Sequence, residues 1–160
     1  MKKLKFILSI GLGALIFSHC SSGNKDKRNS QPVPIASSKS YSLSSVGGMM
    51  GHSQSITITE DSVAVSLIIA ANQFQKDTVY ATPDNIWAEL TTLTNLEDLK
   101  SVKNGASVQP VDGLDDILEV KTERETINIV NGRADNENYK KIEPLVNKLQ
   151  SIIPRNFQSR

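Results

Sequence analysis

Residues able to carry nucleophilic or metal chemistry are scarce in this sequence. The 160 residues include one cysteine, Cys20, and two histidines, His19 and His52. A serine or threonine nucleophile needs a base beside it, and zinc needs several Cys, His or carboxylate ligands at a defined spacing. His52 lies between Gly51 and Ser53 in a predicted loop, and we interpret it as a solvated loop residue. The sequence therefore predicts no catalytic residues, no bound metal and no cofactor.

The densest acidic cluster comprises Asp112, Asp115, Asp116 and Glu119. Oxygen-rich loops of this kind can bind calcium, but this segment lacks the alternating ligand spacing and the terminal bidentate glutamate of an EF-hand loop. We therefore predict that the cluster is a solvated turn that precedes a strand.

The cysteine suits a different chemistry, the thioether attachment of a lipid. Three lysines near the N-terminus precede the uncharged residues 6–17, a layout typical of a secretory signal. These 12 residues fall short of the roughly 20 that a bilayer-spanning helix requires. A secreted domain with a single thiol cannot form an internal disulfide, so Cys20 needs another explanation.

Residues 15–20 resemble the cleavage sites of bacterial lipoprotein signal peptides, although Phe17 and His19 stand where aliphatic and small residues are usual. The resemblance implies a signal peptide at residues 1–19 and acyl chains on Cys20. Two or three chains would give stable membrane attachment outside the cytoplasm. Ser21 is not the aspartate that resembles an inner-membrane retention signal, which favours the outer membrane. The alternative is an ordinary cysteine beside a conventional cleavage site.

The charge of the chain gives no indication of a nucleic-acid partner. Of 18 basic residues, three lie in the predicted leader, so 15 remain against 17 acidic residues and the net charge is −2. The one basic cluster, residues 25–28, lies beside the predicted anchor rather than in the folded part. Residues 20–40 are rich in Ser, Asn, Lys and Pro, and we predict that they form a disordered tether.

The most distinctive local feature is a glycine- and methionine-rich segment between the first two predicted strands. Its glycines permit positive φ angles and close backbone approach, which favours a tight or bulged connection. Two consecutive methionines cannot both face inward on a strand, so at least one is expected to be an adaptable exposed contact. A methionine folded over the sheet edge is the alternative. The predicted partner-binding residues are Gly47, Gly48, Met49, Met50, Gly51 and His52.

The rest of the chain alternates between strand and helix patterns. Period-two patterns predict strands over residues 53–59, 63–70, 116–122 and 125–130, with 63–70 as the central strand. Thr82 is expected to cap a helix that runs to about Thr94 and places Trp87 in the core. Residues 133–135 could pair as an edge. Because Pro144 should occupy a first turn, a last helix is expected from about Glu143 to Ile153.

These elements predict an α+β domain over residues 41–153, with residues 154–160 as a tail. We expect a small, mostly antiparallel sheet of about five strands, with two helices packed on one face.

The arrangement resembles emfourin-like proteins, small inhibitors of thermolysin-type metalloproteases such as protealysin. The matching stretches are residues 41–51, 116–130 and 144–153, and the region between them aligns loosely. Met49 stands where these proteins usually have an aromatic residue, and they are not typically lipidated. The resemblance implies a non-enzymatic, lipid-anchored envelope lipoprotein that binds another protein, such as a metalloprotease. The alternative is a structural or accessory component of a cell-envelope assembly.

Overall fold

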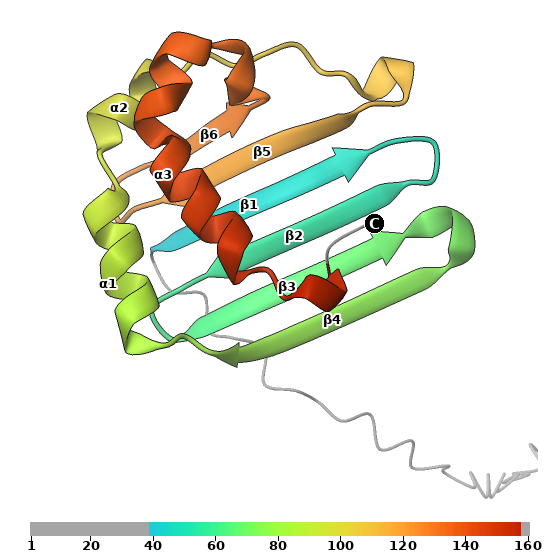
Figure 1. Ribbon diagram of the computed structural model, residues 1–160, viewed down its shortest axis with the longest axis horizontal. Helices are drawn as coiled ribbons and strands as arrows, with labels where there is room; N and C mark the ends of the chain where they lie inside the picture. The colour runs from blue at the N-terminus through green and yellow to red at the C-terminus, as the bar shows by residue number, and fades with distance from the viewer. Residues whose placement is uncertain (1–38, 158–160) are drawn as a thin grey trace, which may run out of the picture. The chain divides into compact units, whose positions relative to one another are not determined.

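The computed structural model describes residues 39–157, and Figure 1 shows an antiparallel sheet with helices packed against it. The predicted signal peptide, Cys20 and nearly all of the predicted tether lie outside the described residues. The strands are β1 (Ser40–Gly47), β2 (His52–Ile58), β3 (Ser62–Ile69), β4 (Phe74–Ala81), β5 (Leu114–Lys121) and β6 (Thr126–Val130).

The six strands form one sheet in the order β4-β3-β2-β1-β5-β6, and every neighbouring pair is antiparallel. The α+β class is confirmed, whereas the expected number of about five strands is corrected to six. β3 is not the central strand that residues 63–70 were expected to form. β1 and β2 occupy the middle of the sheet, because β5 pairs with the free edge of β1.

Alternation along the strands decides which face is buried. Tyr41, Leu43, Ile56 and Ile58 face inward from the two central strands and are buried. Their neighbours along the chain are mostly Ser and Thr, which point to the opposite face and are half-buried. The helices therefore cover one face only, as the sequence predicts (Figure 1).

Three α-helices, rather than two, cover that face in the described part of the chain: α1 (Asp84–Leu93), α2 (Leu96–Ser101) and α3 (Asn136–Ile152). α2 is separate from α1 because Asn95 is extended and its side-chain oxygen accepts a hydrogen bond from the Glu97 amide at 3.0 Å. Trp87 is half-buried against the core and meets the Tyr41 ring edge to face, with 5.4 Å between ring centroids.

The expected cap of the first helix and the expected start of the last helix are wrong. α1 is preceded by Pro83, and the Thr82 hydroxyl donates to the Thr59 carbonyl at 2.8 Å instead of capping the helix. α3 begins at Asn136, so Pro144 lies inside it. An interior proline removes one helical hydrogen bond, at a cost of about 3 kcal/mol. Burial of the α3 side chains Ile142, Leu145, Val146 and Leu149 outweighs that cost.

The segments flanking α3 also differ from expectation. Residues 133–135 do not form an edge strand: the 3-10 turn η3 (Gly132–Ala134) leads directly to the cap residue Asp135. After α3, the 3-10 turn η4 (Arg155–Phe157) returns to the sheet, where Phe157 is buried. Gln54 donates to the Phe157 carbonyl at 2.6 Å, so the folded domain extends beyond Ile153.

Candidate functional site

The glycine- and methionine-rich segment is the turn between β1 and β2, as expected. Gly47 ends β1, His52 begins β2, and the two residues pair across the ladder. Within the turn the Gly51 amide donates to the Gly48 carbonyl at 3.0 Å. Both methionines are exposed: the exposed fraction is 81% for Met49 and 47% for Met50.

The glycines of this turn meet a steric requirement. Gly47, Gly48 and Gly51 have φ angles of 131°, 72° and 62°, in the region that side chains with a Cβ rarely adopt. A Cβ on Gly47 would lie 2.5 Å from the Gly113 carbonyl oxygen, and one on Gly51 would lie 2.8 Å from the Ala70 Cβ. Gly47 and Gly51 therefore require glycine for both conformation and space, and Gly48 requires it for conformation.

Two neighbouring loops fix the turn from either side. On the β5 side, the 3-10 turn η2 (Gln109–Val111) leads to Gly113, whose carbonyl accepts from the Gly48 amide at 3.0 Å. On the β3 side, the 3-10 turn η1 (Ala70–Asn72) donates through the Ala71 amide to the Met50 carbonyl at 3.0 Å. The methionines therefore extend from a backbone that is held at both ends.

The strand register places further apolar side chains beside the methionines. Leu114, Gly47, His52, Ile69 and Phe74 occupy one row across five strands, because each pairs with the next in the ladder. Leu114 and Phe74 are exposed in this row, and Val111 on η2 is 78% exposed. In Figure 1 the three loops lie together at the right-hand end of the sheet. We call this surface the apolar tip: Met49, Met50, Phe74, Val111 and Leu114.

Sequence reasoning identified only part of this surface. Phe74 and Val111 lie in segments where apolar residues show no clear periodicity. Leu114 precedes the strand predicted over residues 116–122, whereas the structure places it in β5. Gln73 and Asp112, both with positive φ, mark tight turns next to these residues. An aspartate that tolerates positive φ directly after an apolar residue, as Asp112 follows Val111, is the turn signal that could have identified part of this surface.

The acidic cluster is not the solvated turn that the sequence predicts, because three of its four residues lie in β5 and Asp115 is buried. β5 begins at Leu114, so Asp115 and Asp116 are consecutive strand residues that point to opposite faces. Asp115 is buried and accepts three hydrogen bonds: from the Ser107 hydroxyl at 2.6 Å, the Asn131 side-chain amide at 2.7 Å and the Val108 amide at 2.8 Å. These bonds hold the pKa of Asp115 below its usual value, the Ser107 bond most of all. Asp115 therefore anchors the loop that carries η2.

The remaining predicted residues are placed as follows. His52 is not the solvated loop residue that the sequence predicts: it begins β2, and its imidazole is half-buried in the row between Gly47 and Ile69. Within residues 39–157 no group of three His, Cys, Asp or Glu side chains is arranged to hold a metal ion. Over the same residues, no helix combines the length and the apolar character needed to cross a bilayer. Cys20 lies outside the described part.

Comparison with known proteins finds no family model and no curated sequence that matches this chain.

Proposed function

We propose that this chain is a lipid-anchored, non-enzymatic binding domain of the cell envelope, and that its apolar tip inserts into an apolar cleft of a partner protein. The observation that carries the proposal is the exposure of Met49 and Met50 on a turn whose backbone is fixed, with the exposed Val111 on the adjoining η2 loop. Contiguous exposed apolar side chains of this kind are typical of protein interaction sites.

The energetics of such a tip favour binding. Burial of one large apolar side chain contributes about 1.5–3 kcal/mol, and about 1.4 kcal/mol changes affinity tenfold. Because the glycine-rich backbone is already ordered, little conformational entropy is lost on association. The thioether side chains of Met49 and Met50 can adapt to the shape of a cleft.

The position of the tip also suits a tethered protein. The chain enters the sheet at Ser40, and the tip follows Gly47 at the other end of the same strand. Eight residues of β1 span roughly 26 Å at about 3.3 Å per residue. An anchor on Cys20 would therefore join the domain at the end remote from the tip and leave the tip accessible.

The more specific form of the proposal is inhibition of a thermolysin-type metalloprotease. It is supported by the resemblance of residues 41–51 to emfourin-like proteins, since these residues are β1 and most of the methionine turn. A rigid, protruding turn is a shape that can enter a protease cleft. Nothing in this form of the proposal requires catalysis by the chain itself.

The first test is an inhibition assay with the full chain in phosphatidylcholine nanodiscs. Titration into thermolysin-like proteases should reduce peptide hydrolysis at micromolar concentration. Replacement of both methionines, Met49→Ser with Met50→Ser, should weaken inhibition at least about tenfold, because two apolar contacts are lost. Leu93→Ser is the matched control, because Leu93 is also exposed but lies on α1.

The outcomes separate the two levels of the proposal. No inhibition by the wild-type chain at micromolar concentration removes the inhibitor form. Inhibition that survives the double methionine substitution removes the tip as the binding surface.

The alternative function, an accessory component of an envelope assembly, is favoured by a second surface. β4 is an edge strand of eight residues, and within residues 39–157 it pairs only with β3. The other edge is partly occupied, because Asn104 and Gly105 hydrogen-bond to Val130 of β6 at 3.0 and 2.8 Å. A partner strand could therefore add to β4.

Crosslinking in cells distinguishes these surfaces. A photoreactive residue at Met49 should capture the partner if the tip binds it. Capture from Gln75 on β4, with none from Met49, would instead support strand addition.

A further inference from the structure

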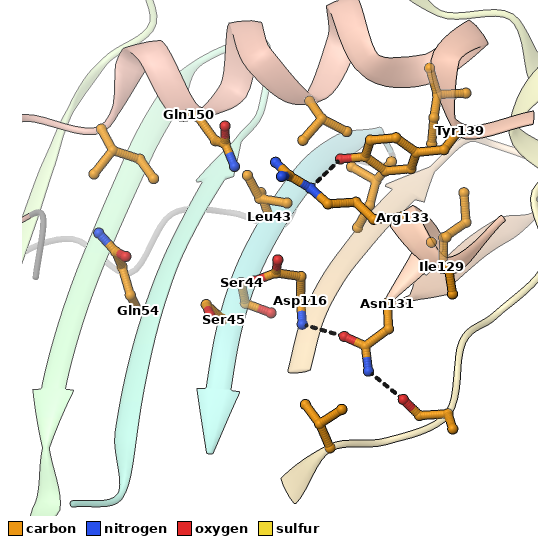
Figure 2. A pocket seen from close by; sticks show the side chains of 18 residues that line it. Leu43, Ser44, Ser45, Gln54, Asp116, Ile129, Asn131, Arg133, Tyr139 and Gln150 are labelled. Carbon is orange, nitrogen blue, oxygen red and sulfur yellow. Dashed lines mark hydrogen bonds between the residues drawn. The ribbon is translucent and has the colours of Figure 1, made fainter. Parts of the chain in front are cut away.

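A pocket of about 430 Å³ lies between the inner face of the sheet and α3 (Figure 2). Its apolar wall includes Leu43 and Leu118 from the sheet and Ile142 and Val146 from α3, all of which belong to the buried core. Pockets that hold small molecules or cofactors fall in the range of about 300–1,000 Å³. The pocket is therefore large enough for one large apolar residue with its flanking polar groups.

Polar side chains also line the pocket, and four of them carry groups that can bind a ligand: Gln54, Asp116, Arg133 and Gln150. Figure 2 shows Gln54, Asp116, Arg133 and Gln150 around the hollow that Leu43 borders. All four are exposed or half-buried, so water reaches them when the pocket is empty of ligand. An apolar interior with a few convergent polar groups is typical of a ligand site.

The arginine is held in place. The Arg133 Nε donates to the Tyr139 hydroxyl at 3.3 Å, and the guanidinium carbon lies 5.6 Å from the centroid of the Tyr139 ring. This contact uses one of the five guanidinium N–H groups and leaves the others able to donate to an acceptor. Arg133 therefore supplies an oriented cation at the opening.

Asp116 supplies the opposite charge. Its backbone amide donates to the Asn131 side-chain oxygen at 2.9 Å, which fixes the residue at the start of β5. In residues 39–157 the Asp116 carboxylate and the Arg133 guanidinium form no ion pair with each other. The Asp116 carboxylate attracts the Arg133 guanidinium through space and contributes to the raised pKa of Arg133, but no direct contact between them neutralises either charge.

Gln54 and Gln150 add further hydrogen-bonding groups to the pocket. The Gln54 amide nitrogen donates to the Phe157 carbonyl at 2.6 Å, which leaves the Gln54 oxygen as an acceptor. Gln150 can donate and accept. The opening thus offers donors at Arg133 and Gln150 and acceptors at Asp116 and Gln54, around an apolar interior.

We infer that this pocket binds an apolar amino-acid residue, whose side chain enters the interior while its acceptor group meets Arg133 and its donor group meets Asp116. A simple carboxylate would leave Asp116 without a donor and bring two anions together. A simple amine would leave Arg133 without an acceptor and bring two cations together. The matching chemistry comes from a free amino acid or from a residue within a peptide.

This site is independent of the proposed role of the apolar tip. None of the five tip residues lines the pocket. Loss of tip binding through the methionine substitutions would leave pocket binding unchanged, so failure of either proposal can be recognised separately.

The test uses saturation-transfer NMR on the full chain in phosphatidylcholine nanodiscs, with empty nanodiscs as background. The probes are leucine, N-acetyl-leucine-N-methylamide, isocaproate, which lacks the amine of leucine, and isoamylamine, which lacks its carboxylate. Leucine or its blocked form should bind more tightly than either truncated probe. Tighter binding of leucine assigns a free amino acid, and tighter binding of the blocked form assigns a peptide.

Charge substitutions provide the second part of the test. Arg133→Gln and Asp116→Asn should each weaken leucine-probe binding about fivefold or more, because each removes a charge-assisted hydrogen bond at a partly exposed site. Arg124→Gln and Asp61→Asn are matched controls outside the pocket and should have no effect. Unchanged melting temperatures would show that the variants fold.

Three results would overturn the inference. One is absence of saturable binding by both leucine probes up to about 10 mM. Another is equal binding of isocaproate or isoamylamine. The third is binding that neither Arg133→Gln nor Asp116→Asn weakens in a folded protein.

Discussion

At the scale of single residues, Asp115 connects its own strand to two other segments of the chain. Its carboxylate accepts hydrogen bonds from Ser107, Val108 and Asn131, so it joins the loop before η2 and the end of β6 to β5. The same loop supports Val111 of the tip and lines the pocket with Val108. One buried carboxylate therefore maintains both candidate sites.

Asp115→Asn should lower the melting temperature at neutral pH, because an amide cannot accept all the hydrogen bonds that the carboxylate accepts. The pKa of Asp115 is lowered from 3.8 in the folded state, so the carboxylate stabilises the fold above that value. This contribution is lost as pH falls through the folded pKa. The melting-temperature difference between wild type and variant should therefore be full near pH 7 and shrink below pH 3.8.

The control for this prediction is Asp61→Asn, at an exposed turn residue between β2 and β3. Circular dichroism melts of both variants across the pH range provide the measurement. An Asp115→Asn difference that stays constant down to the most acid pH would contradict the assigned role of the carboxylate.

At the scale of elements, α3 forms much of the wall of the pocket and much of the core. Asp135 caps its start by accepting from the Asn138 backbone amide at 3.5 Å. Its other carboxylate oxygen accepts from the Asn138 side-chain amide at 2.9 Å and from the Lys103 backbone amide at 3.0 Å. Lys148 of α3 forms an ion pair with Glu89 of α1. The helix continues through Pro144 because the Asp135 cap, the ion pair to α1 and the burial of its apolar face do not depend on the hydrogen bond that the proline removes.

Pro144→Ala should raise the free energy of unfolding by about 1–3 kcal/mol, because alanine restores an amide donor and relieves the clash of the ring with the preceding turn. Urea denaturation of the full chain in nanodiscs measures the change. Asn147→Ala, also exposed on α3, is the control and should gain only about 0.7 kcal/mol or less from helix propensity. A loss of stability in Pro144→Ala would show that the proline fits a bend that the helix needs.

At the scale of the whole molecule, the domain has distinct ends. The chain enters beside the β5–β6 turn, where Lys39 pairs with Glu123 at 3.1 Å. The apolar tip lies at the other end of β1, beside the β3–β4 and η2 loops. This arrangement suits a domain that is attached at one end and binds at the other.

If Cys20 is the anchor, mass spectrometry of the purified protein should find an N-terminal peptide that begins at Cys20 and carries a diacylglycerol thioether. Cys20→Ser should abolish this modification, because a hydroxyl does not form the thioether, while Ser21→Ala should retain it. An unmodified Cys20 thiol, or an intact leader on the wild-type protein, would refute lipid attachment.

Local periodicity was enough to predict much of the fold. The alternation of apolar residues predicted strands over 116–122 and 125–130, and β5 and β6 occupy most of these residues, with Leu118 opposite Ile129 and Val120 opposite Ile127. Three glycines predicted the tight turn that presents Met49 and Met50. These features depend on residues close in sequence, so the α+β class and the methionine turn followed from the sequence by itself.

Only the tertiary structure decided the sixth strand, the interior position of Pro144 and the pocket, because contacts between residues distant in sequence determine these features. β4 was missed because Lys76 and Thr78 lie on the same face as Tyr80, and only pairing with β3 makes this segment a strand. The interior position of Pro144 depends on burial of the helix face around it. The pocket brings Gln54, Asp116, Arg133 and Gln150 together from separate elements, since long-range packing has no signature in local spacing.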